Sequence, residues 1–209
     1  MSDSCCSPPP PSSDVSYRRV LWIALAANAA MFFIELAASL WSGSSALAAD
    51  AADFLGDSAN YAFSLGAIAL GGAWLSRVAL VKGAVMVLYG VAVLGYAGWR
   101  AWLGLPPEPL TMGAVGLLAL GVNFGVATLL YRFREGDANM RSVWLCTRND
   151  VIGNIAVLAA AAGVFGTGTV WPDVAVAAVL AILGLASGPV VVREALNELN
   201  GRRAGSRSA

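Results

Sequence analysis

The sequence predicts an all-α membrane protein with six transmembrane helices. Hydrophobic residues make up 58% of the 209 residues, and charged residues only 12%. A soluble domain carries about 25% charged residues, so this chain has too few polar side chains to cover a surface in water. Apolar runs of about 20 residues, the length needed to cross a bilayer, fill most of the chain. We therefore expect lipid to be its main solvent.

The six runs follow one another with short turns rich in Gly, Ser and Pro between them, a pattern typical of tightly connected helices. Residues 1–17 are polar and proline-rich and are expected to form a disordered cytoplasmic tail, and 193–209 a second short tail. The transmembrane domain is expected to occupy 18–192. Its predicted spans are 20–41, 46–71, 83–103, 110–131, 143–165 and 174–192.

The basic residues predict the orientation of these spans, because Lys and Arg collect on the cytoplasmic side. Eleven of the 13 basic residues flank one side of the membrane. Arg100 alone flanks the other side, and Arg148 lies inside the fifth span. Both termini are therefore expected in the cytoplasm, and the protein is expected to be multi-pass in the cell (inner) membrane.

Charge and composition also exclude some functions. A formal net charge of zero leaves no basic stripe for nucleic acid. The absence of histidine removes the commonest nitrogen ligand for metals and the usual proton switch near neutral pH. Metal or proton chemistry must therefore use carboxylates, amides or thiols. Cys5 and Cys6 in the first tail are compatible with binding of a soft metal or with incidental thiols.

Acidic residues inside the second span are its most informative feature. Asp53 and Asp57 are four residues apart and share a helical face. A charge at mid-membrane costs at least ~2.5–3.5 kcal/mol, and two like charges this close repel unless something cationic lies between them. This pair favours metal binding. Asp50, near the non-cytoplasmic end, is expected to cap the helix instead.

The fifth span carries a second polar face. Cys146, Asp150 and Asn154 follow one another at four-residue spacing. Cys146 and Asp150, added to the two aspartates of the second span, make a four-ligand set of the right number for a tetrahedral ion. The alternative for Cys146 is packing as a small hydrophobic residue, and both readings stay open.

Other polar residues inside the spans are weaker candidates for metal ligands. Asn149 or Asn154 could supply an amide ligand in place of the thiol, which would favour harder metals such as Mn²⁺. Glu35 in the first span is equally compatible with a structural and a functional carboxyl group.

Three more polar side chains are expected to serve structure or orientation. Asn28 and Asn123 are predicted to form hydrogen bonds between helices. Arg148 has three possible placements: reaching the cytoplasmic face, lying in a wet vestibule, or pairing with a carboxylate.

These motifs together resemble a known family. Asn28 and Glu35, followed by SGSSALAADAADFLGD and later by CTRNDVIGN, are similar to the cation diffusion facilitators, which are six-helix metal-ion/proton antiporters and not enzymes. The resemblance implies a transport site made of paired residues in the second and fifth spans. It also implies that Asp50 is an acidic neighbour of that site and no ligand. Carried over, the paired positions are Asp53, Asp57, Cys146 and Asp150.

The resemblance implies Zn²⁺/H⁺ antiport by alternating access, with no organic cofactor. The alternative is transport of Cd²⁺, Co²⁺, Fe²⁺ or Mn²⁺ by the same fold, because Asp53 and Cys146 stand where zinc-selective members usually carry histidine. Members of the family often have a cytoplasmic C-terminal domain, for which 193–209 is too short. The expected homodimer would then form through the transmembrane helices.

Two other classes were weighed. An intramembrane aspartyl protease also needs two aspartates on neighbouring helices, and Gly56-Asp57 faintly matches its Gly-x-Gly-Asp element. Phe54 occupies the place of the first glycine, however, and the Tyr-Asp and Pro-Ala-Leu elements are absent. A channel-like or purely structural membrane protein is the second alternative, and it would not require a proton gradient.

Overall fold

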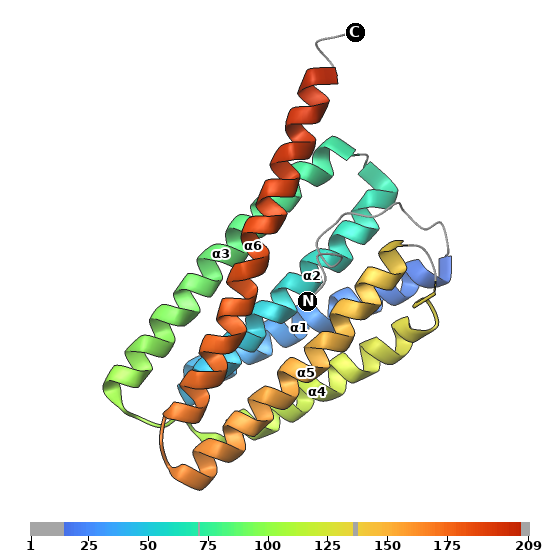
Figure 1. Cartoon of the computed structure of the whole chain (residues 1–209). Coiled ribbons are helices and arrows are strands. Elements are labelled where there is room, and N and C mark those ends of the chain that lie inside the picture. Colours follow the sequence, from blue (N-terminus) through green and yellow to red (C-terminus); the bar gives the residue numbers. More distant parts are fainter. Residues whose placement is uncertain (1–14, 71, 136–137, 206–209) are drawn as a thin grey trace.

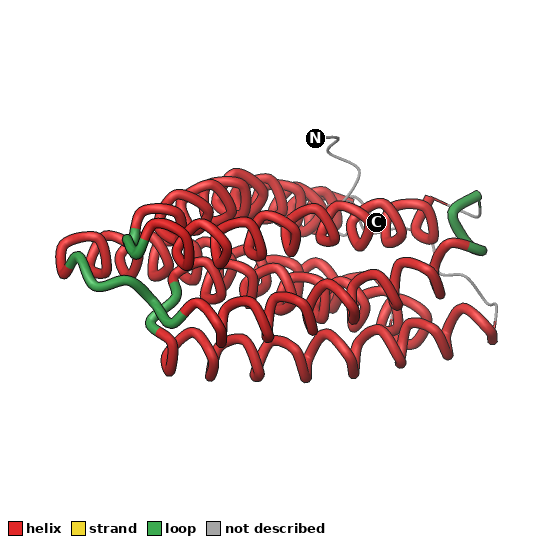
Figure 2. Tube along the Cα trace, turned by 90° about the horizontal axis from the view of Figure 1, so that it is seen from below, coloured by secondary structure: helices red, strands yellow, loops and turns green. Residues whose placement is uncertain are grey.

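The computed structural model describes residues 15–70, 72–135 and 138–205, and every regular element within them is an α-helix (Figures 1 and 2). The helices lie side by side along a common direction in Figure 2. In chain order they are α1 (Val15–Ser42), α2 (Ser45–Leu70), α3 (Gly72–Leu103), α4 (Pro109–Tyr131), α5 (Ala138–Thr167) and α6 (Trp171–Gly205).

The prediction of six helices is confirmed. The main differences from the predicted spans lie at the helix ends that the sequence places on the cytoplasmic side. α3 begins at Gly72, well before the expected span. α6 continues to Gly205, so most of the segment expected as a tail is helical. The sequence REALNELNGRR after the sixth span is rich in strong helix formers. At the other end, α1 starts at Val15, inside the expected first tail. Cys5 and Cys6 lie outside the described residues.

Not all six helices are equally apolar. In the described residues, four helical segments are long and apolar enough to cross a membrane: all of α1 and α4, residues 79–103 of α3, and Cys146–Thr167 of α5. The apolar part of α6, Trp171–Ala186, is shorter, and α2 carries Asp50, Asp53 and Asp57. α2 contacts α1, α3, α5 and α6, so protein rather than lipid surrounds its polar face.

The helices form a group of four and a pair. α1 packs on α2, α4 on α5, α1 on α4 and α2 on α5, which closes a four-helix arrangement. α3 and α6 pack on each other more extensively than any other two helices and run side by side in Figure 1. Contacts of α2 with α3 and α6, and of α5 with α6, join the pair to the group. α2 and α5 therefore lie where the two parts meet.

Glycines allow the close crossing of α3 and α6. A Cβ atom on Gly83 would lie 2.7 Å from Val192 Cγ2 and 3.1 Å from the Gly188 carbonyl oxygen. No side chain fits at that distance, so the two backbones touch, as small residues permit in membrane helix pairs.

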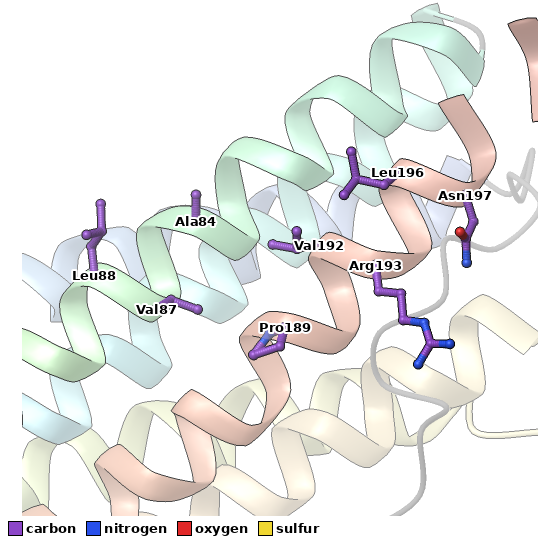
Figure 3. A pocket seen from close by; sticks show the side chains of 8 residues that line it. All are labelled: Ala84, Val87, Leu88, Pro189, Val192, Arg193, Leu196 and Asn197. Atoms are coloured by element: carbon purple, nitrogen blue, oxygen red, sulfur yellow. The ribbon is translucent and has the colours of Figure 1, made fainter. Parts of the chain in front are cut away.

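A groove of about 730 Å³ runs beside this crossing (Figure 3). None of the residues predicted to form a metal site lines it. The side chains around it are mostly apolar and come from α3 and α6: Ala84, Val87, Leu88, Pro189, Val192, Arg193, Leu196 and Asn197.

The start of α2 is capped by a residue of α6. Asp173, fully buried, accepts hydrogen bonds from the Ser44 hydroxyl (2.6 Å), the Ser45 N–H (2.8 Å) and the Ala46 N–H (3.0 Å). The expectation that Asp50 caps this helix is therefore wrong. Asp50 lies beyond the first turn, and Asp173 already satisfies the N–H groups that need an acceptor.

Candidate metal centre

The candidate site forms where α2 packs against α5. Gly153 presents no side chain to α2, and a Cβ atom there would lie 3.9 Å from Asp53 Oδ2 and 4.0 Å from Asp50 Oδ1. The carboxylates of Asp50 and Asp53 therefore lie directly against the backbone of α5. Asp150 and Asn154 flank Gly153 along α5 and face the same helix, as the four-residue spacing predicts.

Asp57 is held from both helices. The Tyr61 hydroxyl, one turn further along α2, donates to Asp57 Oδ2 at 2.9 Å. That hydroxyl also lies 2.7 Å from Thr147 Oγ1 of α5, and the Thr147 hydroxyl donates to the Val143 carbonyl oxygen at 3.1 Å. Asp57, Tyr61 and Thr147 are all buried. The orientation of the Asp57 carboxylate is therefore fixed by a hydroxyl chain that crosses from α2 to α5.

Asp57 and Asp150 bring two carboxyl groups into contact across the helix interface. The Asp150 carboxyl lies within hydrogen-bonding reach of that of Asp57, and the charges of Asp53 and Asp50 also act on it. No hydrogen-bond donor among the described residues reaches Asp150 Oδ2. Two carboxyl groups this close repel each other when both are ionised, unless a cation lies between them. The pair is therefore a candidate for holding a cation.

A second carboxyl pair lies nearby, between Asp50 and Glu35. Both side chains are at most 1% exposed, and their charges interact, although neither oxygen of Glu35 has a hydrogen-bond donor among the described residues. Asn154 donates to Asp50 Oδ2 at 2.8 Å, and Asn123 of α4 donates to Asn154 Oδ1 at 2.9 Å. These hydrogen bonds extend from α2 through α5 to α4, and Asn154 is the residue that bridges them.

Asp53 is partly exposed and lines a small cavity between α2, α3 and α6. The cavity has a volume of about 20 Å³ and is otherwise lined by small and apolar residues, with Tyr89 of α3 and Leu180 of α6 among them. That volume is enough for about one water molecule. The Tyr89 hydroxyl is buried and makes no hydrogen bond to a described residue.

The structure does not join the predicted ligands into one group. Among the residues it describes, no three Cys, Asp or Glu side chains converge closely enough to hold a metal ion. Cys146 is partly buried, one turn before Asp150 on α5. The contact that the structure makes is between Asp57 and Asp150, so the complete set with Asp53 and Cys146 stays a prediction.

The other polar residues are distributed as follows. Asn123 bonds between helices, as expected, but Asn28 donates to the Ala24 carbonyl oxygen within α1 at 2.9 Å. The expectation of an interhelical bond from Asn28 is therefore wrong. Asn149 and Arg148 are exposed. The Arg148 guanidinium lies 5.4 Å from the centre of the Trp144 ring and donates to Asn149 Oδ1 at 3.4 Å.

Comparison with known proteins agrees with this architecture. Residues 21–199 match the family model described as the cation efflux transmembrane domain. The chain belongs to the cation efflux family. This is a family of membrane transporters and not of enzymes, so the chain is an integral multi-pass membrane protein, and the protease alternative loses its support.

Several members of the cation efflux family are similar along most of this chain. It is 28% identical over 195 residues to the metal cation efflux system protein CzcD of Cupriavidus metallidurans, covering 87% of this chain and 61% of that protein. It is 26% identical over 200 residues to a cadmium, cobalt and zinc/H(+)-K(+) antiporter of Bacillus velezensis, covering 88% and 63%. The zinc transporter ZitB of Escherichia coli is 27% identical over 199 residues, covering 89% and 63%. The chain thus spans less than two thirds of these relatives.

Reasoning from the sequence missed three residues that shape this centre in a cation efflux member. Tyr61 lies one turn from Asp57 on the same face, so its spacing could have revealed it. Thr147 and Gly153 carry no such signal, since a threonine and a glycine in an apolar helix are ordinary. Their roles become visible only when α2 is placed against α5.

Proposed function

We propose that this chain exports divalent transition-metal ions, foremost Zn²⁺, in exchange for protons. The observation that carries the proposal is the contact between the Asp57 and Asp150 carboxyl groups in the interior of the helix bundle. A divalent cation can replace the protons that such a pair must otherwise hold, because ligands deprotonate when they bind a metal.

The exchange chemistry follows from charge balance. A metal ion that reaches Asp57 and Asp150 from the cytoplasm displaces the protons of these two carboxyl groups, and its two positive charges balance the two carboxylates. When the site opens to the other side, protons from outside displace the metal. The inward proton gradient then drives the outward movement of metal by alternating access. The proposal includes cytoplasmic termini, an inner-membrane location and a homodimer formed through transmembrane helices.

The choice of zinc rests on the type of ligand. Asp53 and Cys146 are proposed to complete the set that begins with Asp57 and Asp150. A thiolate with carboxylates suits Zn²⁺ or Cd²⁺, whereas carboxylates and amides alone suit Mn²⁺. The relatives whose names mention zinc, cadmium and cobalt support this range of substrates. Fe²⁺ and Mn²⁺ are the competing ions if the thiol does not ligate.

The decisive experiment is metal uptake by proteoliposomes that contain a metal-sensitive dye and carry an imposed pH gradient. We expect Asp57→Asn and Asp150→Asn to abolish zinc uptake while the proteins still insert. Glu135→Gln is the matched control, because this exposed carboxylate pairs with Arg134, the preceding residue, outside the helix bundle's interior. Zinc uptake at the wild-type rate by either aspartate variant would contradict the proposed site.

Two further measurements separate the alternatives. Uptake that stops when a protonophore collapses the gradient supports an antiporter, whereas uptake that continues downhill identifies a channel. Cys146→Ser is expected to weaken transport of Zn²⁺ and Cd²⁺ but not of Mn²⁺. If none of these rates changes, Cys146 is a packing residue and the ligand set contains no thiol.

A further inference from the structure

The groove beside the crossing of α3 and α6 changes from apolar to polar along its length (Figure 3). Val87 and Leu88 of α3 and Val192 of α6 line its apolar part. Arg193 and Asn197 line its other part, and Figure 3 shows both side chains extending from the same side of α6. None of the described lining residues is acidic. The groove therefore joins an apolar surface to a positive charge that no described carboxylate of the groove neutralises.

Contacts between glycines and side chains fix how the two helices are aligned. A Cβ atom on Gly83 would lie 2.7 Å from Val192 Cγ2, and one on Gly90 would lie 2.8 Å from Leu185 Cγ. A step forward along α3 therefore corresponds to a step back along α6, so the two helices are antiparallel. Gly83 and Val192 lie at the same level of the bundle.

This level is also where the sequence predicts the edge of the membrane. Gly83 begins the predicted third span and Val192 ends the predicted sixth, on the side that the basic residues predict to be cytoplasmic. At a rise of about 1.5 Å per residue, Leu88 lies about 7.5 Å further into the membrane along α3, and Asn197 lies about 7.5 Å outside it along α6. The apolar part of the groove therefore faces lipid chains, and its charged part lies at the depth of the head groups.

A ligand with an acyl chain and a negative head group matches this polarity. The apolar part can contact an acyl chain, while the Arg193 guanidinium can pair with a phosphate through two N–H groups. Basic pockets between transmembrane helices on the cytoplasmic side bind anionic lipid head groups. The groove volume of about 730 Å³ falls within the range of about 300–1,000 Å³ for ligand pockets. A small soluble anion would leave the apolar part unused, so the groove favours a phospholipid.

We propose that this groove binds one anionic phospholipid of the cytoplasmic leaflet, with an acyl chain along α3 and α6 and the phosphate on Arg193. Asn197, one turn further along α6, supplies a second hydrogen-bond donor to the head group. The bound lipid contacts both helices at their crossing and holds the pair together from the cytoplasmic side. This inference does not depend on the proposed metal site, because none of the proposed metal ligands lines the groove.

The test is native mass spectrometry of the purified full-length protein in detergent, with phosphatidylglycerol and phosphatidylcholine of identical acyl chains as the added lipids. The wild-type protein is expected to bind the anionic lipid about five-fold more tightly, which is the effect of about one basic residue. Arg193→Gln should abolish this preference, and Arg193→Lys should retain most of it because the charge remains. Arg19→Gln is the matched control and should keep the preference, since this exposed base of α1 lies on the same predicted side of the membrane but outside the groove.

A second pair of variants tests the apolar part of the groove. Ala84→Leu enlarges an exposed side chain of α3 that lines the groove, so it should weaken the binding of both lipids. Ala26→Leu makes the same change at an exposed position of α1 outside the groove and should leave lipid binding unaltered. Circular dichroism of each variant verifies that the helices are intact.

Three results would overturn the inference. The first is a preference that survives in Arg193→Gln, or that Arg19→Gln loses to the same extent, since general surface charge would then attract the lipid. The second is normal lipid binding by Ala84→Leu. The third concerns the mass of the oligomer, which the same spectra report. If Ala84→Leu converts a dimer into a monomer without weakening lipid binding, a second copy of the chain occupies the groove.

Discussion

Asn154 of α5 donates a hydrogen bond of 2.8 Å to the carboxylate of Asp50 in α2. The same amide accepts from Asn123 of α4 at 2.9 Å, so one side chain connects three helices. In a bundle surrounded by lipid, apolar burial contributes little to the association of helices, and polar bonds of this kind become important. The acidic face of α2 is therefore held in place by an uncharged partner.

Replacement of Asn154 by leucine is expected to lower the free energy of unfolding by about 1–2 kcal/mol. The substitution keeps the size of the side chain but leaves Asp50 and Asn123 without their partner. Denaturation in mixed micelles, followed by helical circular dichroism, measures the effect. Asn149→Leu serves as the control, because Asn149 is exposed. Equal stability of the two variants would contradict a bridging role for Asn154.

Asp173→Ala is expected to destabilise the start of α2 by about 1–2 kcal/mol, the usual range for loss of a helix cap. The substitution deprives the Ser44 hydroxyl and the N–H groups of Ser45 and Ala46 of their acceptor. Hydrogen exchange at those two amides should accelerate. Asp173→Asn retains one acceptor oxygen and should lie between wild type and Asp173→Ala. Unchanged exchange in Asp173→Ala would show that the cap is dispensable.

The stability of the first turn of α4 is expected to depend on pH through the carboxyl group of Glu108. Hydrogen bonds from the Thr111 hydroxyl and N–H, and from the Leu110 N–H, lower the pKa of this exposed carboxyl group. Because the folded-state pKa lies below the ordinary value of 4.5, the stabilisation is fully present above pH 4.5. It is lost as the pH falls through the lowered pKa.

A titration of the Leu110 and Thr111 amide shifts by NMR should therefore report a midpoint below 4.5, the ordinary value for glutamate. In Glu108→Gln the midpoint should disappear. A midpoint at or above the ordinary value in the wild-type protein would show that the cap does not form.

The crossing of α3 and α6 provides a fourth prediction. Gly83→Ala is expected to cost about 1–3 kcal/mol, the range for overpacking, because the added Cβ meets Val192 and the backbone of α6. Gly95→Ala on the same helix is the matched control, since nothing lies within 4 Å of its Cβ position. It should be neutral or slightly stabilising. Thermal unfolding of both variants in detergent compares them, and equal midpoints would argue against close contact at Gly83.

Much of the fold could be predicted from the sequence, because the length and apolarity of a membrane span are local properties. The ends were harder to predict. α6 continues to Gly205 through a segment whose charges indicate that the membrane has ended, although its residues still favour a helix. The charge pattern reports the edge of the bilayer and not the end of the helix.

Only part of the candidate site could be predicted, because sequence spacing describes one helix and not how two helices pack. Four-residue spacing places Asp53 and Asp57 on one face, but it does not say which of the two carboxyl groups meets that of Asp150. The structure brings Asp57 to Asp150 and leaves Asp53 beside a small cavity. The prediction that Asp50 caps α2 was wrong because Asp173, which is distant in the sequence, accepts the hydrogen bonds at the start of that helix. Such a contact depends on how α6 packs, and no local pattern encodes it.

The cap supplied by Asp173 also has a mechanical consequence. Its hydrogen bonds pin the first turn of α6 to the first turn of α2. α6 is 35 residues long, which corresponds to about 50 Å. While these bonds hold, the first turns of α6 and α2 stay together in any movement of the α3–α6 pair. A rigid tilt of α6 about this end would therefore displace the other end of the helix most.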